Sequence, residues 1–468
     1  MRRTKIVCTI GPASDSEEMI AKLIAAGMNV ARLNFSHGTP EYQRGLIRKL
    51  KRVRKALNKP VAILQDLQGP KIRIGVIESG FVQLLPGNPF VLTADDVPGD
   101  ANRASVSMKS LPHEVQPGHS ILLADGNIEL RVEEVVPPDI RCRVMVGGFL
   151  SSHKGINLPG SDIHVDSLTM KDRKDIVIGL EEGVDAIALS FVRKASDISA
   201  CREAIQEHAG NIPIIAKIEK HEAVDDIDGI LAASQAVMVA RGDLGVEIDL
   251  EKVPLVQKMI IHKCNALGKP VITATQMLQH MVDNPRPTRA EATDVANAVL
   301  DGTDAVMLSD ETAAGKYPAE AVMMMDRIAR AAECSLDEMK FENIPIEAGT
   351  RDAISRASYF IAKEIGAAAI ITPTWSGSTA CLVSRFRPKQ PILATTPNEA
   401  ALDFLSLCWG VIPVSIPPSE TIDDVIRLSI DAARRAGYVE SGQHVIITGG
   451  APLHVPGNTN FIKVDRVD

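Results

Sequence analysis

Eight short runs of apolar, β-favouring residues recur along the first two thirds of the chain. Each run ends in polar, glycine or proline residues, and most are followed by sequence with helical spacing. Strands that alternate with helices indicate βα units, and eight such units in order close a TIM (β/α)8 barrel, which we therefore predict. The eight runs are Lys5 to Ile10, Met28 to Leu33, Val61 to Gln65, Ala186 to Phe191, Pro213 to Ala216, Ala236 to Ala240, Pro270 to Ala274 and Asp304 to Leu308.

One long segment, from Lys71 to Asp166, interrupts this pattern. It has short alternating strands such as Phe81-Val82-Gln83-Leu84, hairpin signals at Asp125-Gly126-Asn127 and Gly147-Gly148, and almost no helical periodicity. We predict an all-β insertion, a small β-barrel that follows the third barrel strand and acts as a lid over the barrel end where active sites occur.

A second alternating pattern begins near Ile344 and predicts a separate C-terminal α/β domain. The predicted division is residues 1–70 and 167–343 for the barrel, 71–166 for the lid and 344–468 for a C-terminal regulatory domain. The strands expected in the last domain are Ala369 to Thr372, Pro391 to Ala394, Val411 to Val414, His444 to Thr448 and Phe461 to Val464.

Composition excludes several classes of protein. The net charge of −8 argues against a general nucleic-acid binder, which needs clustered basic residues. No apolar run approaches the length of a membrane-spanning helix, so we expect no membrane association. The seven cysteines have no metal-site spacing and indicate reduced thiols in a cytoplasmic protein.

The predicted strand ends carry an unusual number of charged and hydroxyl side chains, and a barrel keeps its chemistry at that rim. Glu219 and Asp243 follow neighbouring strands and suit a hard divalent cation such as Mg²⁺, although each could instead pair with Lys217 or Arg241. The rim residues are Arg32, Asn34, Ser36, His37, Asp66, Lys71, Arg73, Lys217, Glu219, Arg241, Asp243, Thr275, Ser309 and Glu311.

Other rim residues also leave two interpretations open. Arg32, Arg73, Lys171 and Lys217 could bind a phosphate, or could be solvated surface charges. Thr275 could contact a substrate, or could bond to its own backbone. His37 could likewise be a turn residue.

Several long motifs in this order resemble the pyruvate kinase family. They are Thr4 to Pro12 (TKIVCTIGP), Arg32 to Gly38 (RLNFSHG), Lys217-Ile218-Glu219, Met238 to Glu247 (MVARGDLGVE), Ala274 to Leu278 (ATQML) and Arg286 to Glu291 (RPTRAE). The resemblance covers most of the chain and is looser in the last 120 residues or so. It implies Mg²⁺-dependent phosphoryl transfer from phosphoenolpyruvate to ADP, which gives pyruvate and ATP, in a homotetramer with an allosteric C-terminal domain.

The resemblance also implies roles for individual residues. Glu219 and Asp243 would ligate Mg²⁺, and a second Mg²⁺ would arrive with ADP. Residues implied in catalysis are Lys217, Thr275, Arg32 and Ser309. Those implied in phosphoenolpyruvate binding are Arg32, Arg73, Ser190, Lys217, Gly242, Asp243 and Thr275, and those in nucleotide binding are Pro12, Asn34, His37, Tyr42, Arg73 and Lys171.

Lys71 departs from the pattern of K⁺-dependent members, which carry glutamate after the Gly-Pro of the third strand. A lysine there resembles the K⁺-independent branch, in which the ammonium group replaces the monovalent ion. The residues that resemble the K⁺ ligands are Asn34, Ser36, Asp66 and Leu67. The alternative is a surface lysine at the lid hinge.

Two C-terminal loops resemble the effector site of the family. Thr374, Ser376, Gly377, Ser378 and Thr379 form a hydroxyl-rich helix start, and Gly457 and Thr459 lie in the second loop. Because basic residues are missing, we predict a monophosphorylated activator rather than fructose 1,6-bisphosphate. An ordinary helix cap would explain the first loop equally well.

Two other functions remain open from the sequence. A different Mg²⁺-dependent barrel enzyme that stabilises an enolate, such as a lyase or aldolase, could use the same carboxylates. A catalytically silent metabolite sensor could use the C-terminal domain alone. Pyruvate formation that requires ADP would distinguish the kinase from both.

Overall fold

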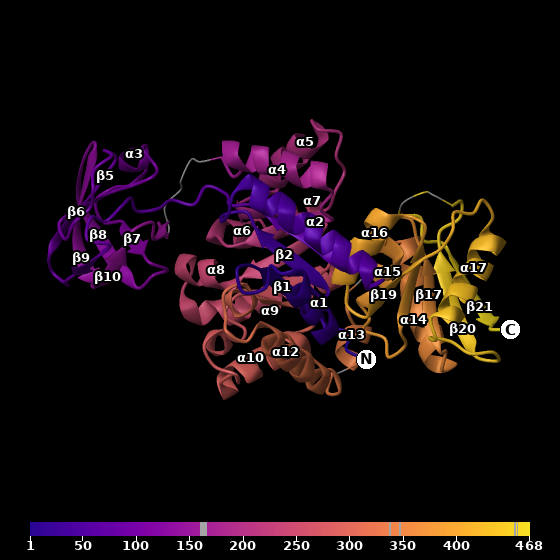
Figure 1. Ribbon diagram of the computed structural model, residues 1–468. Coiled ribbons are helices and arrows are strands. Elements are labelled where there is room, and N and C mark those ends of the chain that lie inside the picture. Colours follow the sequence, from indigo (N-terminus) through magenta and orange to yellow (C-terminus); the bar gives the residue numbers. More distant parts are fainter. Residues whose placement is uncertain (160–165, 337, 346–347, 454, 456) are drawn as a thin grey trace.

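The structure is a computed structural model that describes residues 1–159, 166–336, 338–345, 348–453, 455 and 457–468. A closed barrel of eight parallel strands forms its centre (Figure 1), in the order β1-β16-β15-β14-β13-β12-β3-β2. Each strand overlaps one of the eight predicted runs, so the predicted TIM barrel is confirmed. The strands are β1 (Lys5–Ile10), β2 (Val30–Asn34), β3 (Ala62–Asp66), β12 (Ala186–Val192), β13 (Ile214–Ile218), β14 (Ala236–Ala240), β15 (Val271–Ala274) and β16 (Ala305–Leu308).

Helices surround the barrel, and several begin at a threonine that caps them. Thr169 and Thr288 each form a capping box, with Asp172 and Glu291, and so satisfy amides at the start of their helices. The helices are α1 (Glu17–Ala26), α2 (Pro40–Ala56), α4 (Met170–Glu182), α5 (Ala195–Gln206), α6 (His221–Asp225), α7 (Ile227–Ala233), α8 (Arg241–Glu247), α9 (Val253–Leu267), α10 (Arg289–Asp301), α11 (Asp310–Ala313), α12 (Pro318–Glu333) and α13 (Glu338–Glu342). Two short 3-10 turns, η1 (Leu250–Lys252) and η2 (Gln279–Val282), accompany them.

The barrel interior is filled mainly by small and aliphatic side chains such as Ala62, Ile215 and Met238. Phe404 and Leu407, which come from the C-terminal part of the chain, belong to the same buried cluster. The apolar interior is therefore completed by side chains from outside the barrel sequence.

The inserted segment lies apart from the C-terminal domain, on the opposite side of the barrel (Figure 1). Its strands form a six-stranded sheet, β11-β7-β8-β9-β5-β6, and a two-stranded sheet, β10-β4. Arg73 and Ile74 bridge Gly155 and Val106, which lie beside the edge strands β11 and β6. The elements are β4 (Phe81–Leu84), β5 (Pro89–Thr93), β6 (Arg103–Ser105), α3 (Leu111–Glu114), β7 (Ser120–Leu123), β8 (Ile128–Val136), β9 (Asp139–Val146), β10 (Gly148–Ser151) and β11 (Ile156–Asn157).

One of the two hairpin predictions in this segment is wrong. Asp125-Gly126-Asn127 does join the antiparallel strands β7 and β8. Gly147-Gly148 joins β9 to β10, but β10 pairs with β4 rather than with β9. A Cβ atom at Gly147 would lie 2.4 Å from the carbonyl oxygen of Leu84, so this glycine allows a close approach where the chain changes sheets.

The C-terminal domain is a five-stranded sheet, β19-β18-β17-β20-β21, with only β21 antiparallel to its neighbour. All five predicted strands are present, so the predicted α/β class is confirmed. The elements are α14 (Thr350–Glu364), β17 (Ala369–Pro373), α15 (Ser378–Ser384), β18 (Ile392–Thr396), α16 (Glu399–Phe404), η3 (Leu405–Leu407), β19 (Val411–Ser415), α17 (Ile422–Arg435), β20 (His444–Gly449) and β21 (Phe461–Arg466). Among the described residues, no helix combines the length and apolarity needed to span a bilayer.

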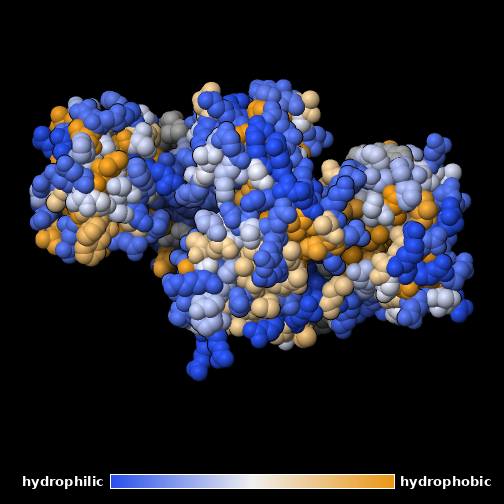
Figure 2. Space-filling model, in the orientation of Figure 1, coloured by the Kyte–Doolittle hydropathy of each residue, from blue (hydrophilic) through white to orange (hydrophobic). Residues whose placement is uncertain are grey.

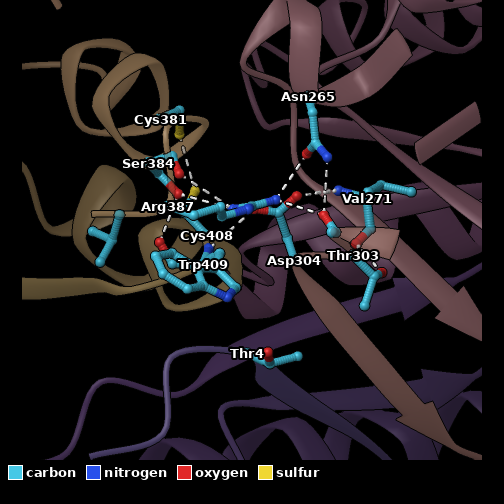
Figure 3. Close-up of polar contacts among 12 residues, drawn as sticks. Thr4, Asn265, Val271, Thr303, Asp304, Cys381, Ser384, Arg387, Cys408 and Trp409 are labelled. Atoms are coloured by element: carbon cyan, nitrogen blue, oxygen red, sulfur yellow. Dashed lines mark hydrogen bonds and ion pairs between the residues drawn. The ribbon is translucent and has the colours of Figure 1, made fainter. Parts of the chain in front are cut away.

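A buried polar network joins this domain to the barrel, and we call it the seam (Figure 3). It consists of Asn265, Asp304, Arg387 and Trp409. Arg387 donates to Asp304 Oδ1 at 3.0 Å and to Asn265 Oδ1 at 2.7 Å, and the amide of Trp409 donates to Asp304 Oδ1 at 3.1 Å. Because Asp304 directly precedes β16, the seam lies at the amino end of the barrel strands.

Candidate active site

At the opposite, carboxyl end, four neighbouring strands bring a buried charged cluster together. Asp66 ends β3 and accepts from Arg32 Nε of β2 at 2.6 Å, and Lys217 Nζ of β13 lies 3.2 Å from its other oxygen. Ser190 of β12 accepts from Lys217 Nζ at 2.7 Å and donates to the carbonyl of Leu67 at 2.7 Å. The structure thus brings together three predicted rim residues, Arg32, Asp66 and Lys217, with Ser190 and Leu67, which the family resemblance implied for the site.

Charge compensation, rather than burial, decides the ionisation of this cluster. Burial acts to raise the pKa of Asp66, but the charges of Lys217 and Arg32 outweigh it and lower the pKa overall. Burial acts to lower the pKa of Lys217, and Asp66 and Glu219 outweigh it in the opposite direction, so that the pKa is raised. Lys217 therefore holds a fixed positive charge at neutral pH.

Glu219 and Asp243 supply two carboxylates beside this charge. Glu219 lies 2.8 Å from Lys217 Nζ and accepts from the amide of Phe191 at 2.7 Å. Burial raises the pKa of Glu219, Lys217 partly offsets this, and the charge of Asp243 raises it further. A positive ion between the two carboxylates would relieve their repulsion.

The alternative interpretation of these carboxylates, in which they pair with Lys217 and Arg241, is correct for Glu219 only. Lys217 does pair with Glu219, but Arg241 points elsewhere and lies 2.7 Å from Asp294. Asp243 is left with Lys71, whose Nζ lies 3.5 Å from Asp243 Oδ1. The oxygens of Asp243 are therefore only weakly engaged by the protein.

Thr275 has a backbone conformation that is unusual for a β-branched residue. Its φ is +72°, and that of Gln276 is +54°. The Thr275 hydroxyl donates to the carbonyl of Ala274 at 2.6 Å, as the local alternative predicted, but it also accepts from the amide of Gly242 at 2.8 Å. Arg241 donates to the Thr275 carbonyl at 2.7 Å and so supports the turn. Strain held in this way is typical of functional sites.

Ser309 and Glu311 close the rim at the eighth strand. Glu311 is fully buried and accepts from the amides of Ser309 and Leu278 at 2.7 and 3.0 Å. Burial raises the pKa of its carboxyl group. Glu311 therefore fixes the backbone around Ser309 rather than facing a ligand.

The residues predicted to face a nucleotide lie at the edge of this cluster. Pro12 and His37 are exposed. The Tyr42 hydroxyl donates to Asp15 at 2.9 Å, and partial burial together with this bond raises the pKa of Tyr42 to about 12. Lys171 Nζ donates to the carbonyl of Phe35 at 2.6 Å.

Three more predicted residues are engaged locally. Asn34 Oδ1 accepts from the amide of Ser36 at 3.0 Å. Arg73 donates to the carbonyl of His153 at 3.1 Å, so its guanidinium contacts the insert instead of the Asp66 cluster. Lys71 Nζ lies 3.5 Å from Asp243 Oδ1, so its ammonium group faces the rim rather than only the surface of the hinge.

Sequence reasoning missed two contacts that bear on the site. Thr9 accepts from Arg32 Nη1 at 2.9 Å and so helps to orient the guanidinium. Glu247 lies 2.7 Å from Lys220 Nζ and accepts from Asn157 of the insert at 3.0 Å, which ties β11 to the end of α8. Both residues lie inside motifs that were identified, but only their neighbours had an evident chemical role.

A cleft between the insert and the barrel opens beside this contact. Polar residues such as Lys71 and Lys220 line it together with apolar ones, which are Pro70, Ile72, Ile156, Leu158 and Phe191. Figure 2 shows mainly hydrophilic residues on the visible surface between the insert and the barrel. The insert therefore meets the barrel at an accessible cleft of mixed polarity, unlike the buried seam.

The predicted effector loops line a cavity in the C-terminal domain. Thr374 Oγ1 accepts from the amide of Gly377, which has φ +88° and begins α15. Thr379 and Thr459 hydroxyls lie 2.7 Å apart and join the two loops. Thr374, Ser376, Ser378, Thr379 and Gly457 all line this cavity, so the structure brings them together as predicted.

A magnesium ion fits the donor set of the rim, although no group of three or more possible metal-binding side chains occurs among the described residues. Mg²⁺ commonly binds through one or two carboxylates and completes its shell with water and substrate oxygens. Glu219 and Asp243 are two such carboxylates, and burial, with a smaller contribution from the charge of Asp243, raises the pKa of Glu219.

Comparison with known proteins gives one answer along the whole chain. Residues 1–322 match the family model "Pyruvate kinase, barrel domain", and residues 352–465 match "Pyruvate kinase, alpha/beta domain". A pyruvate kinase of Clostridium acetobutylicum is 46% identical over 473 residues, which cover 100% of both chains. A pyruvate kinase of Geobacillus stearothermophilus is 49% identical over 99% of this chain and 80% of its own length. One of Staphylococcus aureus is 48% identical over 100% of this chain and 81% of its own length. The chain therefore belongs to the pyruvate kinase family, the Mg²⁺-using transferases that convert phosphoenolpyruvate and ADP to pyruvate and ATP in glycolysis.

Proposed function

We propose that the chain carries out this phosphoryl transfer at the rim cluster, with Lys217 as the central group. The observation that carries the proposal is the environment of Lys217, whose side chain is 10% exposed and whose ammonium group contacts Asp66, Ser190 and Glu219. A buried charge held by three partners is already oriented before substrate binds. Such preorganised charge is most effective where negative charge develops during a reaction.

The remaining roles follow from reach and charge. Loss of the phosphoryl group leaves an enolate oxygen, and Lys217 stabilises that developing negative charge. Arg32, held by Asp66 and Thr9, presents its guanidinium to the transferring phosphoryl group. Two further residues complete the phosphate contacts. Ser190 accepts from Lys217 through its hydroxyl, and Arg73 lies on the insert and reaches the phosphate when the insert closes.

Thr275 and the start of α8 hold the other end of the substrate. The amides of Gly242 and Asp243 and the Thr275 hydroxyl form the donor group for the carboxylate of phosphoenolpyruvate. After transfer, Thr275 and Ser309 relay a proton to the enolate carbon. Pro12, Asn34, His37, Tyr42 and Lys171 form the nucleotide side.

Glu219 and Asp243 would hold the magnesium ion. When bound there, the ion would neutralise charge on the substrate phosphate and enolate oxygens, and a second would come with ADP. The chain itself contributes the two carboxylates, with Glu219 held beside Lys217.

This assignment is tested by Glu219→Gln and Asp243→Asn, with Glu222→Gln as the matched control in the neighbouring cleft. Both site variants are expected to need at least about tenfold more Mg²⁺ for half-maximal turnover, because each removes an anionic ligand. Binding of Mn²⁺ to the enzyme, measured by electron paramagnetic resonance, should weaken in parallel without any turnover. If both variants titrate like Glu222→Gln in both measurements, the metal site lies elsewhere.

We also propose that Lys71 takes the place of a monovalent cation. Its Nζ lies 3.5 Å from Asp243 and 25% of its side chain is exposed, so it belongs to the site but is not locked in it. Asn34, Ser36, Asp66 and the carbonyl of Leu67 would then have no need of K⁺ as a partner.

For the C-terminal domain we propose activation by a monophosphorylated metabolite. Among the described residues that line the cavity between the two loops, none is lysine or arginine. Hydroxyl and amide donors from Thr374, Ser376, Gly377, Ser378 and Thr379 suit one phosphate group, and two would lack countercharge. Activation by ribose 5-phosphate, glucose 6-phosphate or AMP, and its loss in Ser378→Ala, would support this; activation by fructose 1,6-bisphosphate alone would contradict it.

The remaining assignments complete the proposal. The barrel comprises residues 1–70 and 167–343, the lid 71–166 and the regulatory domain 344–468. The enzyme works as a cytoplasmic homotetramer, for which sedimentation at micromolar concentration is the direct measurement.

A further inference from the structure

Two cysteines meet beside the seam. Cys381 lies in α15, and Cys408 directly follows η3. Their sulfur atoms are 2.9 Å apart, and Figure 3 shows the two side chains pointing toward each other. A disulfide bond has a length of about 2.05 Å, so the bond could form after a sulfur movement of about 0.9 Å.

The other five cysteines do not share this arrangement. All seven are free thiols, and in the described part of the chain no second pair of sulfur atoms is in contact. Cys8, Cys142, Cys201 and Cys264 are buried, and Cys334 is exposed on α12's end. A disulfide within the chain is therefore possible at one place without a rearrangement of the fold.

A small cavity gives access to this pair. Cys381 is half-buried and lines the cavity, and the lining also includes Lys269, Arg385, Arg387 and Asp304. Arg387 is paired with Asp304, and Arg385 is paired with Asp352. Cys381 is the more exposed of the two cysteines, so a small oxidant meets its sulfur first.

Cys408 is the less accessible thiol of the pair. It is buried, and its contact with Cys381 together with burial raises the pKa of its thiol. It is shielded from direct oxidation but lies within reach of an oxidised Cys381. The pair has the division of roles found in peroxide-reactive sites, with one exposed sulfur and one resolving thiol.

We propose that Cys381 and Cys408 form a reversible redox modification site that a hydroperoxide closes to a disulfide. The Cys381 thiolate attacks one peroxide oxygen and becomes a sulfenic acid, and the second oxygen leaves as hydroxide, which takes a proton to form water. The Cys408 thiol then attacks the sulfenic sulfur, and the sulfenic hydroxyl leaves as a second water. Two thiols lose two electrons and two protons in total, and one H₂O₂ accepts both.

The position of the bond gives it a structural consequence. α15 begins at Gly377 of the first effector loop, and Ser384 at its other end donates to the carbonyl of Trp409 at 2.6 Å. Trp409 in turn donates its amide to Asp304. A disulfide would therefore fasten the effector-loop helix covalently to the chain segment that contacts the barrel.

The test uses the full chain with Cys334→Ser, which removes the exposed thiol and intermolecular products. The reduced protein is treated with one equivalent of H₂O₂, unfolded in an alkylating agent and analysed by mass spectrometry. The expected product has two fewer alkylated thiols than the reduced protein, contains linked peptides with Cys381 and Cys408, and reverts with dithiothreitol. It should also unfold at a temperature several degrees higher than the reduced protein.

Two further variants separate the steps. Cys408→Ser should stop at a Cys381 sulfenic acid that dimedone traps, without a change in unfolding temperature. Cys264→Ser, which removes a buried barrel thiol, should still form the Cys381–Cys408 link. Six unmodified thiols after oxidation, or linkage through any other pair, would overturn the proposal.

Discussion

The two ends of the barrel each contain a buried aspartate paired with an arginine, but the basic partners of the two aspartates differ in how exposed their side chains are. At the carboxyl end, Asp66 holds Arg32 and Lys217, whose side chains are 12% and 10% exposed. At the amino end, Asp304 holds Arg387, whose side chain is 2% exposed. The first pair keeps donors at an opening, and the second uses its donors within the protein.

The source of the partners explains this difference. Asp304 accepts from the backbone amides of Val271 and Trp409 as well as from Arg387, which itself also binds a backbone carbonyl at Gly302. Asp66 is held by Arg32 and Lys217, and within the described ranges neither of these side chains donates to a backbone carbonyl. A buried ion pair stabilises a fold when it is satisfied, and serves a ligand when it is left partly unsatisfied.

The largest test of this comparison is Lys217→Met. Turnover should fall by at least about 100-fold, because a preorganised charge is lost where negative charge develops. The unfolding temperature should change little, since Asp66 retains Arg32 and Glu219 can take up a proton. Steady-state kinetics and thermal unfolding measure the two effects, and Lys263→Met, which breaks a surface pair with Asp228, is the control. Turnover close to that of the control would remove Lys217 from the reaction.

The reverse effect is expected for Arg387→Met. Loss of the guanidinium leaves Asp304 buried without its charge partner, which should lower the free energy of unfolding by about 3–5 kcal/mol. Turnover of the folded fraction should stay within about twofold, because Arg387 lies at the far end of the barrel. Urea unfolding measures the free energy of unfolding, and steady-state kinetics measure turnover. The control is Arg427→Ala, which breaks an exposed pair with Asp424 and should lower the free energy of unfolding by less than about 1 kcal/mol. A stable Arg387→Met protein with slow turnover would contradict the division between the two ends.

A smaller effect at the carboxyl end is expected for Lys71→Glu. Without K⁺ its turnover should drop by on the order of tenfold, since a charge near 4 Å from Asp243 is reversed. Adding K⁺ should restore part of the loss, while the unmodified enzyme should be equally active in K⁺, Na⁺ or an organic cation at constant ionic strength. Strict K⁺ dependence of the unmodified enzyme would show that Lys71 does not act as the internal cation.

The smallest expected effect concerns pH at the amino end. Arg54 pairs there with Asp185 of the barrel at 2.6 Å and with Asp403 of α16 at 3.1 Å. Burial, and then the charge of Asp185, raise the pKa of Asp403 to about 7, and Lys51 and Glu399 also act on it. Between about pH 4 and 7 the folded state binds a proton that the unfolded state has lost, so stability should decrease as pH rises through this window.

Asp403→Asn mimics the protonated form and should reduce this slope. Its unfolding temperature should exceed that of the unmodified enzyme by a few degrees at pH 8 and match it below about pH 4. Differential scanning calorimetry across this range measures the slope, and kinetics at each pH should remain unchanged. An unaltered slope would assign the pH dependence to other groups.

The sequence predicted the barrel well because parallel strands that are buried on both faces consist of short, continuous apolar runs, and such runs are visible in the sequence. It predicted the rim for the same reason, since residues such as Asp66 and Asp243 follow those runs directly. It could not predict the seam, because Asp304 meets Arg387 and Trp409 across 83 and 105 residues of chain. Gly147 was misassigned because a double glycine has the same local signal whether a chain turns back or changes sheets.

The burial of Phe404 and Leu407 in the barrel interior has a consequence for synthesis on the ribosome. All eight barrel strands have been translated by residue 308, whereas Phe404 follows about a hundred residues later. At roughly 5–20 residues per second, the nascent barrel waits about 5–20 seconds with its amino end uncovered. During that interval its apolar interior is open to chaperones and to other nascent chains. A translation product that ends before residue 404 would therefore be an aggregation-prone barrel rather than a smaller active enzyme.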